Sequence, residues 1–134
     1  HGAPWHVSKV YYDMSLHRGR FVALDSAMHA AGMGRPYASW IAEWGEDAGV
    51  HNRLTTFIPC ADYFEVRDDA LRAHATQIDP DGHWFAVPLE IQRAGWPTED
   101  YQLVKSTVPV KLPESDLFAG VREPDSLGTW CYSI

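Results

Sequence analysis

The sequence has few cysteines, no long apolar run and no excess of positive charge, and each shortage excludes a class of protein. Cys60 and Cys131 are the only two cysteines, too few for a disulfide scaffold and without a Cys-x-x-Cys spacing, so we expect two free thiols. No stretch approaches the roughly 18 consecutive apolar residues of a membrane helix, and no secretory signal is visible. The formal net charge of -7 is spread along the chain and leaves no basic stripe for a phosphate backbone. We therefore expect a cytoplasmic protein that binds neither membranes nor nucleic acid.

Complete catalytic motifs are missing as well. The seven histidines contain no His-x-His, His-x-x-x-His or His-Glu-x-x-His spacing, so the sequence predicts no metal site within this chain. The glycines fit neither the Rossmann nor the P-loop pattern, which gives nucleotide binding no support. Cys60 precedes His74 and several acids, but no signature of a cysteine hydrolase surrounds it. We interpret Cys60 as an inert residue at a strand end rather than as a nucleophile.

Signals for both helices and strands are present, with no repeat or linker that divides the chain. Strands are predicted at residues 7–12 and 54–58, and extended segments at 63–66 and 101–110. Helices are predicted at 16–31, with Ser15 as N-cap and Gly32 as left-handed C-cap, and at 36–45, 70–78 and 88–95, with a helical turn at 113–119. This mixture indicates one α/β unit over residues 1–134.

The most informative segment is residues 59–78. There an extended piece enters a helix that carries Ala70-Leu71, then His74, then Thr76-Gln77. This pattern resembles a signature of the LmbE-like (PIG-L) deacetylase superfamily. Residues 79–88 and 96–101 are similar to its mycothiol S-conjugate amidase branch, and residues 112–120 to the end of those proteins. With residues 9–12 and 36–37, the resemblance covers almost the whole chain.

The resemblance implies a Rossmann-like α/β enzyme that uses Zn²⁺ to hydrolyse an amide on an amino sugar. In the amidase branch a mycothiol conjugate is cleaved to glucosaminyl-inositol and an N-acetylcysteine conjugate. The metal would polarise the carbonyl and lower the pKa of its bound water, while an acidic residue takes the proton and a histidine assists the leaving amine.

The superfamily motifs that supply these groups, Ala-His-Pro-Asp-Asp-Glu and His-Pro-Asp-His, have no counterpart in the sequence. The first residue is His1 rather than Met, and by the resemblance it would follow shortly after the second motif. We therefore expect residues 1–134 to be the C-terminal half of a single LmbE-like amidase or deacetylase domain. The Zn²⁺ ligands would then lie on an N-terminal half or a companion chain that carries His-Pro-Asp-Asp.

Five residues are candidates for substrate binding. On the predicted helix His74 shares a stripe with Leu71 and Ile78, so we expect it to face inward, either as a buried structural histidine or at the mouth of the site. Gln77, one helical turn later, would orient that imidazole or have a structural role as a cap of the preceding chain. The aromatic residues Trp84, Phe85 and Trp96 would wall a pocket for the group on the conjugate sulfur, or else pack in the core.

The remaining notable residues receive structural interpretations. Trp40 and Trp44 are assigned to the core or to the contact of a homo-oligomer. We expect His17 and His29 to face solvent or to lie at the periphery. Glu90, Glu99 and Asp100 are expected to be surface charges unless one of them lies near the sugar hydroxyls.

Three functions stay open at this point. The chain is part of a mycothiol conjugate amidase, part of an N-acetylglucosaminyl-inositol or other sugar N-deacetylase, or a non-catalytic binding module with an aromatic pocket and no metal half.

Overall fold

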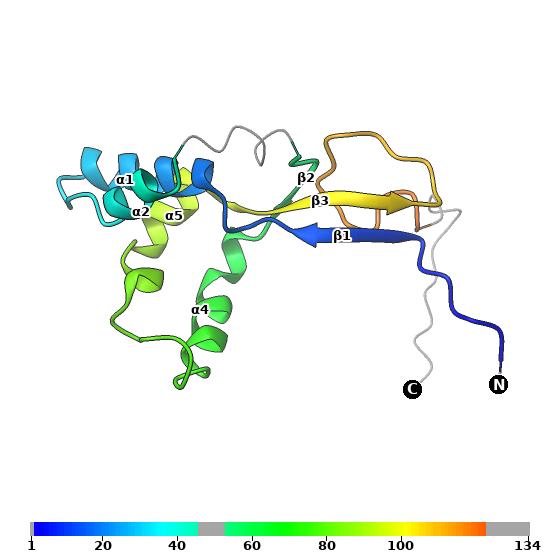
Figure 1. Ribbon diagram of the computed structural model, residues 1–134, viewed down its shortest axis with the longest axis horizontal. Helices are drawn as coiled ribbons and strands as arrows, with labels where there is room; N and C mark the ends of the chain where they lie inside the picture. The colour runs from blue at the N-terminus through cyan, green and yellow to red at the C-terminus, as the bar shows by residue number, and fades with distance from the viewer. Residues whose placement is uncertain (1, 46–52, 123–134) are drawn as a thin grey trace.

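The computed structural model describes residues 2–45 and 53–122, in which short helices gather at one end of a small sheet (Figure 1). The strands are β1 (Lys9–Asp13), β2 (Thr56–Pro59) and β3 (Thr98–Ser106). The α-helices are α1 (Arg18–Ala30), α2 (Ala38–Glu43), α4 (Phe64–Arg72) and α5 (Leu89–Gly95), joined by the 3-10 turns η1 (Ala61–Tyr63) and η2 (His83–Phe85). The mixed α/β prediction is confirmed at this level, and the Rossmann-like arrangement stays a prediction.

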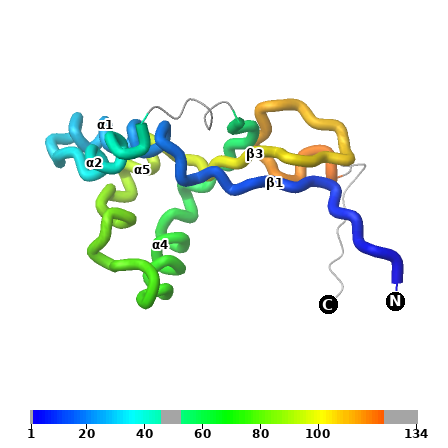
Figure 2. Tube along the Cα trace, viewed as in Figure 1, coloured from blue at the N-terminus to red at the C-terminus, as the bar shows by residue number. Residues whose placement is uncertain are grey.

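The sheet has the strand order β1-β3-β2, and both pairs are antiparallel. In Figure 2 the long strand β3 runs beside β1. Val10 pairs with Lys105 and Tyr11 with Leu103, so Val104 is an extra residue that forms a bulge. Because side chains alternate along a strand, Glu99 and Tyr101 project from one face of β3 and Asp100 from the other.

Helix α1 begins at a histidine cap. The imidazole Nδ1 of His17 accepts a hydrogen bond from the Arg20 backbone N–H at 3.3 Å, so His17 is the N-cap and the prediction of Ser15 is wrong. At the other end Gly32 takes a φ of 71°, as predicted for a left-handed C-cap. The buried face of α1 packs with α2 and α5 in a core of Phe21, Leu24, Met28, Tyr37 and Val87, with Trp40, Ile41, Ile91 and Trp96 partly buried around it.

Helix α4 lies earlier in the chain than the sequence predicted. The sequence predicted a helix at 70–78, but α4 begins at Phe64, directly after η1. Phe64 is 1% exposed and anchors the first turn, so the extended segment predicted at 63–66 is also wrong. The helix ends at Arg72, and the residues predicted to form its last turns lie in exposed turns instead.

The other predictions differ mainly at element boundaries. The helices predicted at 36–45 and 88–95 and the strands at 7–12, 54–58 and 101–110 are present with shifted ends. β2 extends through Pro59, which an edge strand tolerates. No helix forms at 113–119, because Glu114 bridges to Thr56 and its carboxylate binds Lys9 and Tyr11.

Two further findings bear on the class of protein. Among residues 2–45 and 53–122, no helix is long and apolar enough to cross a membrane. Cys60 is a free thiol next to the end of β2, as predicted, and Cys131 lies outside the described residues.

Candidate functional site

A cavity of about 330 Å³ opens where α1, α4 and the start of β3 meet. Its size is at the lower end of the range for small-molecule sites. Side chains at the ends of β1 and β3 and side chains of the helical part line it: Asp13, Ser15, Leu16, Arg20, Phe21, Leu24, Tyr37, Trp40, Arg67, Leu71, His83, Trp84, Gln92, Glu99 and Tyr101. The cavity therefore combines an apolar, largely aromatic wall with one polar side.

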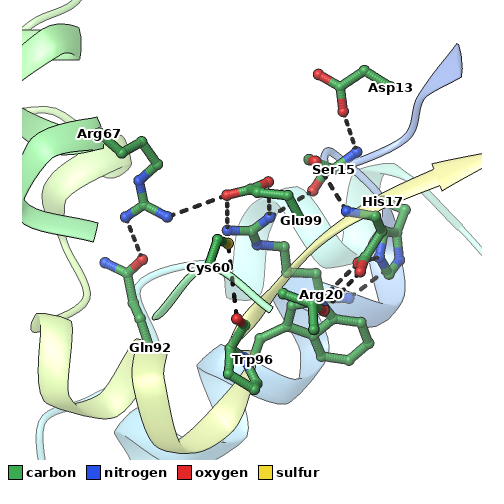
Figure 3. A network of polar contacts seen from close by, with 12 residues as sticks. Asp13, Ser15, His17, Arg20, Cys60, Arg67, Gln92, Trp96 and Glu99 are labelled. Carbon is green, nitrogen blue, oxygen red and sulfur yellow. Dashed lines mark hydrogen bonds and ion pairs between the residues drawn. The ribbon is translucent and has the colours of Figure 1, made fainter. Parts of the chain in front are cut away.

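Glu99 lies at the centre of the polar side, between two arginines (Figure 3). Arg20 donates hydrogen bonds to both carboxylate oxygens, from Nη1 to Oε2 at 2.8 Å and from Nη2 to Oε1 at 3.3 Å. Arg67 reaches Oε1 from the opposite side with Nη1 at 3.4 Å. Such forked bonds between guanidinium and carboxylate fix the geometry of all three groups.

Arg67 connects this carboxylate to two further elements. Its Nη2 donates to Asp68 Oδ1 at 2.7 Å and to Gln92 Oε1 at 2.8 Å, and its guanidinium carbon lies 4.3 Å from the centre of the Phe64 ring. The amide of Gln92 in turn donates to the Val87 carbonyl at 2.8 Å. The network thus joins α1, α4, α5 and β3 at the cavity.

The charges of this network set the protonation of its neighbours. Burial alone would raise the pKa of Glu99. The hydrogen bonding and positive charge of Arg20, followed by a hydrogen bond with Ser15 and the charge of Arg67, outweigh burial and hold that pKa below its ordinary value. At Cys60, burial and then the charge of Glu99 raise the pKa of the thiol. A thiol with a raised pKa is a poor nucleophile, which agrees with the interpretation of Cys60 as inert.

On the opposite face of β3, Asp100 is fully buried among uncharged donors. Its Oδ2 accepts from Trp96 Nε1 at 2.7 Å and lies 2.8 Å from His17 Nε2, while Oδ1 accepts from Thr98 Oγ1 at 2.8 Å. Because His17 Nδ1 already accepts the Arg20 N–H, the ring proton sits on Nε2 and points to Asp100. This cluster holds the start of α1 against β3, and hence holds Arg20 beside Glu99.

The aromatic wall is built from neighbouring rings of α2 and η2. Tyr37 and Trp40 stack with ring centres 5.8 Å apart, and the Tyr37 hydroxyl donates to the His83 carbonyl at 3.0 Å. The His83 ring meets Trp40 edge-on at 4.9 Å. Trp84 is 37% exposed at the rim, so part of its ring is available to a ligand.

The structure separates the five residues predicted to bind substrate. Trp84 lines the cavity, whereas His74, Gln77, Phe85 and Trp96 are not among the described residues that line it. The expectation that His74 faces inward is wrong, because α4 ends before it and leaves both His74 and Gln77 exposed. Phe85 packs under the Arg72 guanidinium at 4.4 Å, and Trp96 serves as a donor to Asp100.

Two surface predictions are corrected too. His17 is 3% exposed rather than solvent-facing, because its ring both caps α1 and binds Asp100, whereas His29 is exposed as expected. Asp100 is wholly buried and Glu99 half-buried, while Glu90 is exposed. Sequence reasoning missed Arg20 and Arg67 entirely. The one signal available for them was the adjacent pair Glu99 and Asp100 on a predicted strand. Carboxylates that become buried there need positively charged or hydrogen-bonding partners.

The described residues do not supply a metal site. No group of three or more histidine, cysteine, aspartate or glutamate side chains in residues 2–45 and 53–122 is arranged to hold an ion. Glu99 at the cavity and Asp68 beside Arg67 are instead bonded to arginine, which competes with a cation for the same oxygens. The donor set of this part of the chain therefore does not fit zinc.

Comparison with known proteins gives a consistent set of relatives. The chain is 51% identical over 123 residues to a mycothiol S-conjugate amidase from Streptomyces coelicolor, a match that covers 92% of this chain and 42% of the relative. It is 36% identical over 124 residues to a 1D-myo-inositol 2-acetamido-2-deoxy-alpha-D-glucopyranoside deacetylase from Streptomyces griseus, covering 89% of this chain and 37% of the relative. A deacetylase of the same name from Streptomyces avermitilis is 32% identical over 123 residues, covering 90% and 40%.

The chain thus spans about two fifths of the length of the curated relatives it matches. No protein family profile matches it, and no solved structure does. The described cavity, with its aromatic wall and neutralised polar side, lies within the segment that the relatives share. By these matches the chain is a homologue of the mycothiol S-conjugate amidases and the related inositol deacetylases over the segment that it shares with them, which implies the LmbE-like (PIG-L) group.

Proposed function

We propose that this chain forms part of a zinc-dependent amidase that cleaves mycothiol S-conjugates at the amide between glucosaminyl-inositol and the N-acetylcysteine conjugate. The observation that carries the proposal is the 51% identity to the Streptomyces coelicolor amidase over 92% of this chain. The deacetylases match at lower identity, 36% and 32%. The higher identity favours the amidase as the first candidate.

The role assigned to this chain is to shape the substrate pocket. The cavity offers Trp40, Trp84 and Tyr37 to an apolar group, and its polar side is held rigid by the bonds of Glu99. A mycothiol conjugate carries a variable group on sulfur, and an apolar wall with a few fixed polar groups is the usual way to hold such a group. In this proposal the cavity receives that group.

The catalytic ion belongs elsewhere in the proposed assembly. Because the described residues do not fit zinc, we place the ligands and the general base on a polypeptide with the His-Pro-Asp-Asp motif, either an N-terminal half or a companion chain. The Rossmann-like fold of the whole domain and the cytoplasmic location are part of the same proposal. In this proposal the residues that line the cavity contribute binding and orientation.

The deacetylase relatives support a second candidate, an N-acetylglucosaminyl-inositol N-deacetylase. That reaction shares the amide chemistry but needs no pocket for a thiol conjugate. The aromatic cavity therefore distinguishes the two candidates in principle, since only the amidase substrate has a group to fill it.

The test replaces the matched segment of the Streptomyces coelicolor amidase with this chain and measures hydrolysis by the folded chimaera. Bimane-labelled mycothiol and N-acetylglucosaminyl-inositol are compared as substrates, with the unaltered amidase as control. We expect the conjugate to be cleaved at a higher kcat/KM than the N-acetyl sugar. The reverse preference would establish the deacetylase, and a folded, zinc-loaded chimaera that cleaves neither would leave the chain as a binding module.

A further inference from the structure

The polar side of the cavity has an unusual charge balance for a site with two arginines. The guanidinium of Arg20 is bonded to Glu99, and that of Arg67 to both Glu99 and Asp68. Asp13 adds a third carboxylate to the rim. Two positive charges thus stand against three negative ones, Glu99 and Asp13 in the lining and Asp68 on Arg67, so the lining arginines present no free cation to a ligand.

The terminal nitrogens of the two arginines are already engaged in hydrogen bonds as well. Arg20 uses Nη1 and Nη2 on Glu99, and Nη1 also lies 3.4 Å from the Ser15 carbonyl. Arg67 uses Nη1 on Glu99, and Nη2 on Asp68 and Gln92. A carboxylate on a ligand would lose its water and find donors that are already shared, next to three like charges, which costs free energy.

An uncharged aromatic group meets the opposite situation. The wall offers the stacked pair Tyr37 and Trp40, the half-exposed ring of Trp84 at the rim and the aliphatic side chain of Leu71. Aromatic groups gain from burial against such rings and demand no counterion. The volume of about 330 Å³ accommodates a ring with its substituents.

We propose that Glu99 is a specificity-determining residue, which neutralises Arg20 and Arg67 so that the cavity selects uncharged aromatic groups and rejects anionic ones. The identification of that group as the sulfur substituent of a conjugate rests on the proposed function. The charge selection itself depends only on this cavity. Removal of the Glu99 charge would leave both arginines without their shared partner and turn the polar side into an anion site.

The experiment measures binding of two matched probes to the full 134-residue chain. The probes are N-acetyl-S-benzylcysteinamide and N-acetyl-S-(4-carboxybenzyl)cysteinamide, which differ in one carboxylate and carry no sugar. Titration calorimetry, with the same buffer and pH for both probes, gives the two dissociation constants. We expect the uncharged probe to bind at least about tenfold more tightly than the carboxylate probe.

Variants with matched controls locate the effect. Glu99→Gln should erase or reverse the preference, whereas Glu90→Gln, which removes the same charge from an exposed position on α5, should leave it unchanged. Trp84→Ala should weaken the uncharged probe about tenfold, and Trp5→Ala, at a tryptophan that is 89% exposed outside the cavity, should not. The Trp84 series keeps the test valid if Glu99→Gln does not fold.

Three results would overturn the inference. They are equal binding of the two probes to the unaltered chain, no binding of either, or an unchanged preference in folded Glu99→Gln. Failure here is separable from failure of the proposed function. A chimaera that cleaves bimane-labelled mycothiol while this chain shows no charge preference would refute the selection and keep the amidase, and a charge preference without cleavage would do the opposite.

Discussion

Strand β3 carries two neighbouring carboxylates that the molecule treats in different ways. Glu99 faces the cavity and is held by the two charged guanidinium groups of Arg20 and Arg67. Asp100 faces the core and is held by the neutral donors of His17, Trp96 and Thr98. One carboxylate thus belongs to an ion network beside an open cavity, and the other to a buried cluster with a histidine, a tryptophan and a threonine.

This difference between Glu99 and Asp100 assigns a different role to each face of β3. A buried carboxylate with three neutral donors stabilises one arrangement of α1 and β3 and offers nothing to a ligand. A partly exposed carboxylate between two arginines sets the electrostatic character of the space in front of it. The two faces are coupled, because His17 is both the Asp100 partner and the cap of the helix that carries Arg20.

The largest expected effect is on the core face. Asp100→Asn keeps the shape of the side chain but replaces one acceptor oxygen with an NH₂ donor. In this fully buried site that group would face another donor, from His17, Trp96 or Thr98, and neither would have an acceptor. We expect a loss of about 3 kcal/mol in the free energy of unfolding, measured by urea denaturation. The exposed Glu90→Gln is the control and should change it by less than about 0.5 kcal/mol. An Asp100→Asn chain as stable as the control would refute the claim that the Asp100 cluster stabilises the packing of α1 on β3.

A smaller loss is expected on the cavity face. Glu99→Gln removes the shared partner of Arg20 and Arg67, but both guanidinium groups keep other acceptors and some contact with water. We expect a loss of about 1 to 2 kcal/mol in the same urea experiment. If Glu99→Gln costs more than Asp100→Asn, the ranking of the two faces is wrong.

The pH dependence of stability isolates the Glu99 contribution further. A carboxyl whose pKa is lower in the folded than in the unfolded chain stabilises the fold above its unfolded value, and that contribution is lost as the pH falls through the folded pKa. For Glu99 the loss should therefore appear below the ordinary value of 4.5. Urea midpoints measured on acidification should fall more steeply for the unaltered chain than for Glu99→Gln, and parallel curves would contradict the lowered pKa.

The smallest effect on stability is expected at the rim. Trp84 is 37% exposed and outside the buried core cluster, so Trp84→Ala should lower the free energy of unfolding by less than about 1 kcal/mol. Thermal denaturation of Trp84→Ala is compared with that of Phe21→Ala, a substitution in the buried core that should cost about 3 to 5 kcal/mol. A loss at Trp84 as large as that at Phe21 would make it a core residue rather than a binding residue.

The sequence predicted helices and strands well where the pattern was local. The helix predicted at 16–31 is present as α1, and Gly32 follows its end with the left-handed φ that the sequence predicted. The start of α1 was missed because the cap is an imidazole rather than a hydroxyl, and histidine at that position is a weak signal.

The site was harder to predict because its contacts are distant in the sequence. Glu99 meets Arg20 across 79 positions and Arg67 across 32, and no local spacing encodes such pairs. His74 was misplaced for a related reason, since Phe64 anchors α4 early and the helix ends two residues before it. Of the five predicted pocket residues, Trp84 alone is among those that line the cavity, whereas Trp96 donates its indole N–H to Asp100.

The central claim is that the cavity beside Glu99 receives the sulfur substituent of an amidase substrate. The most direct test introduces Trp84→Ala into the chimaera with the Streptomyces coelicolor amidase and measures KM and kcat for two substrates. We predict that KM for bimane-labelled mycothiol rises about tenfold, while hydrolysis of N-acetylglucosaminyl-inositol, which lacks the substituent, is unchanged. An equal loss on both substrates, or no change on either, would contradict the claim.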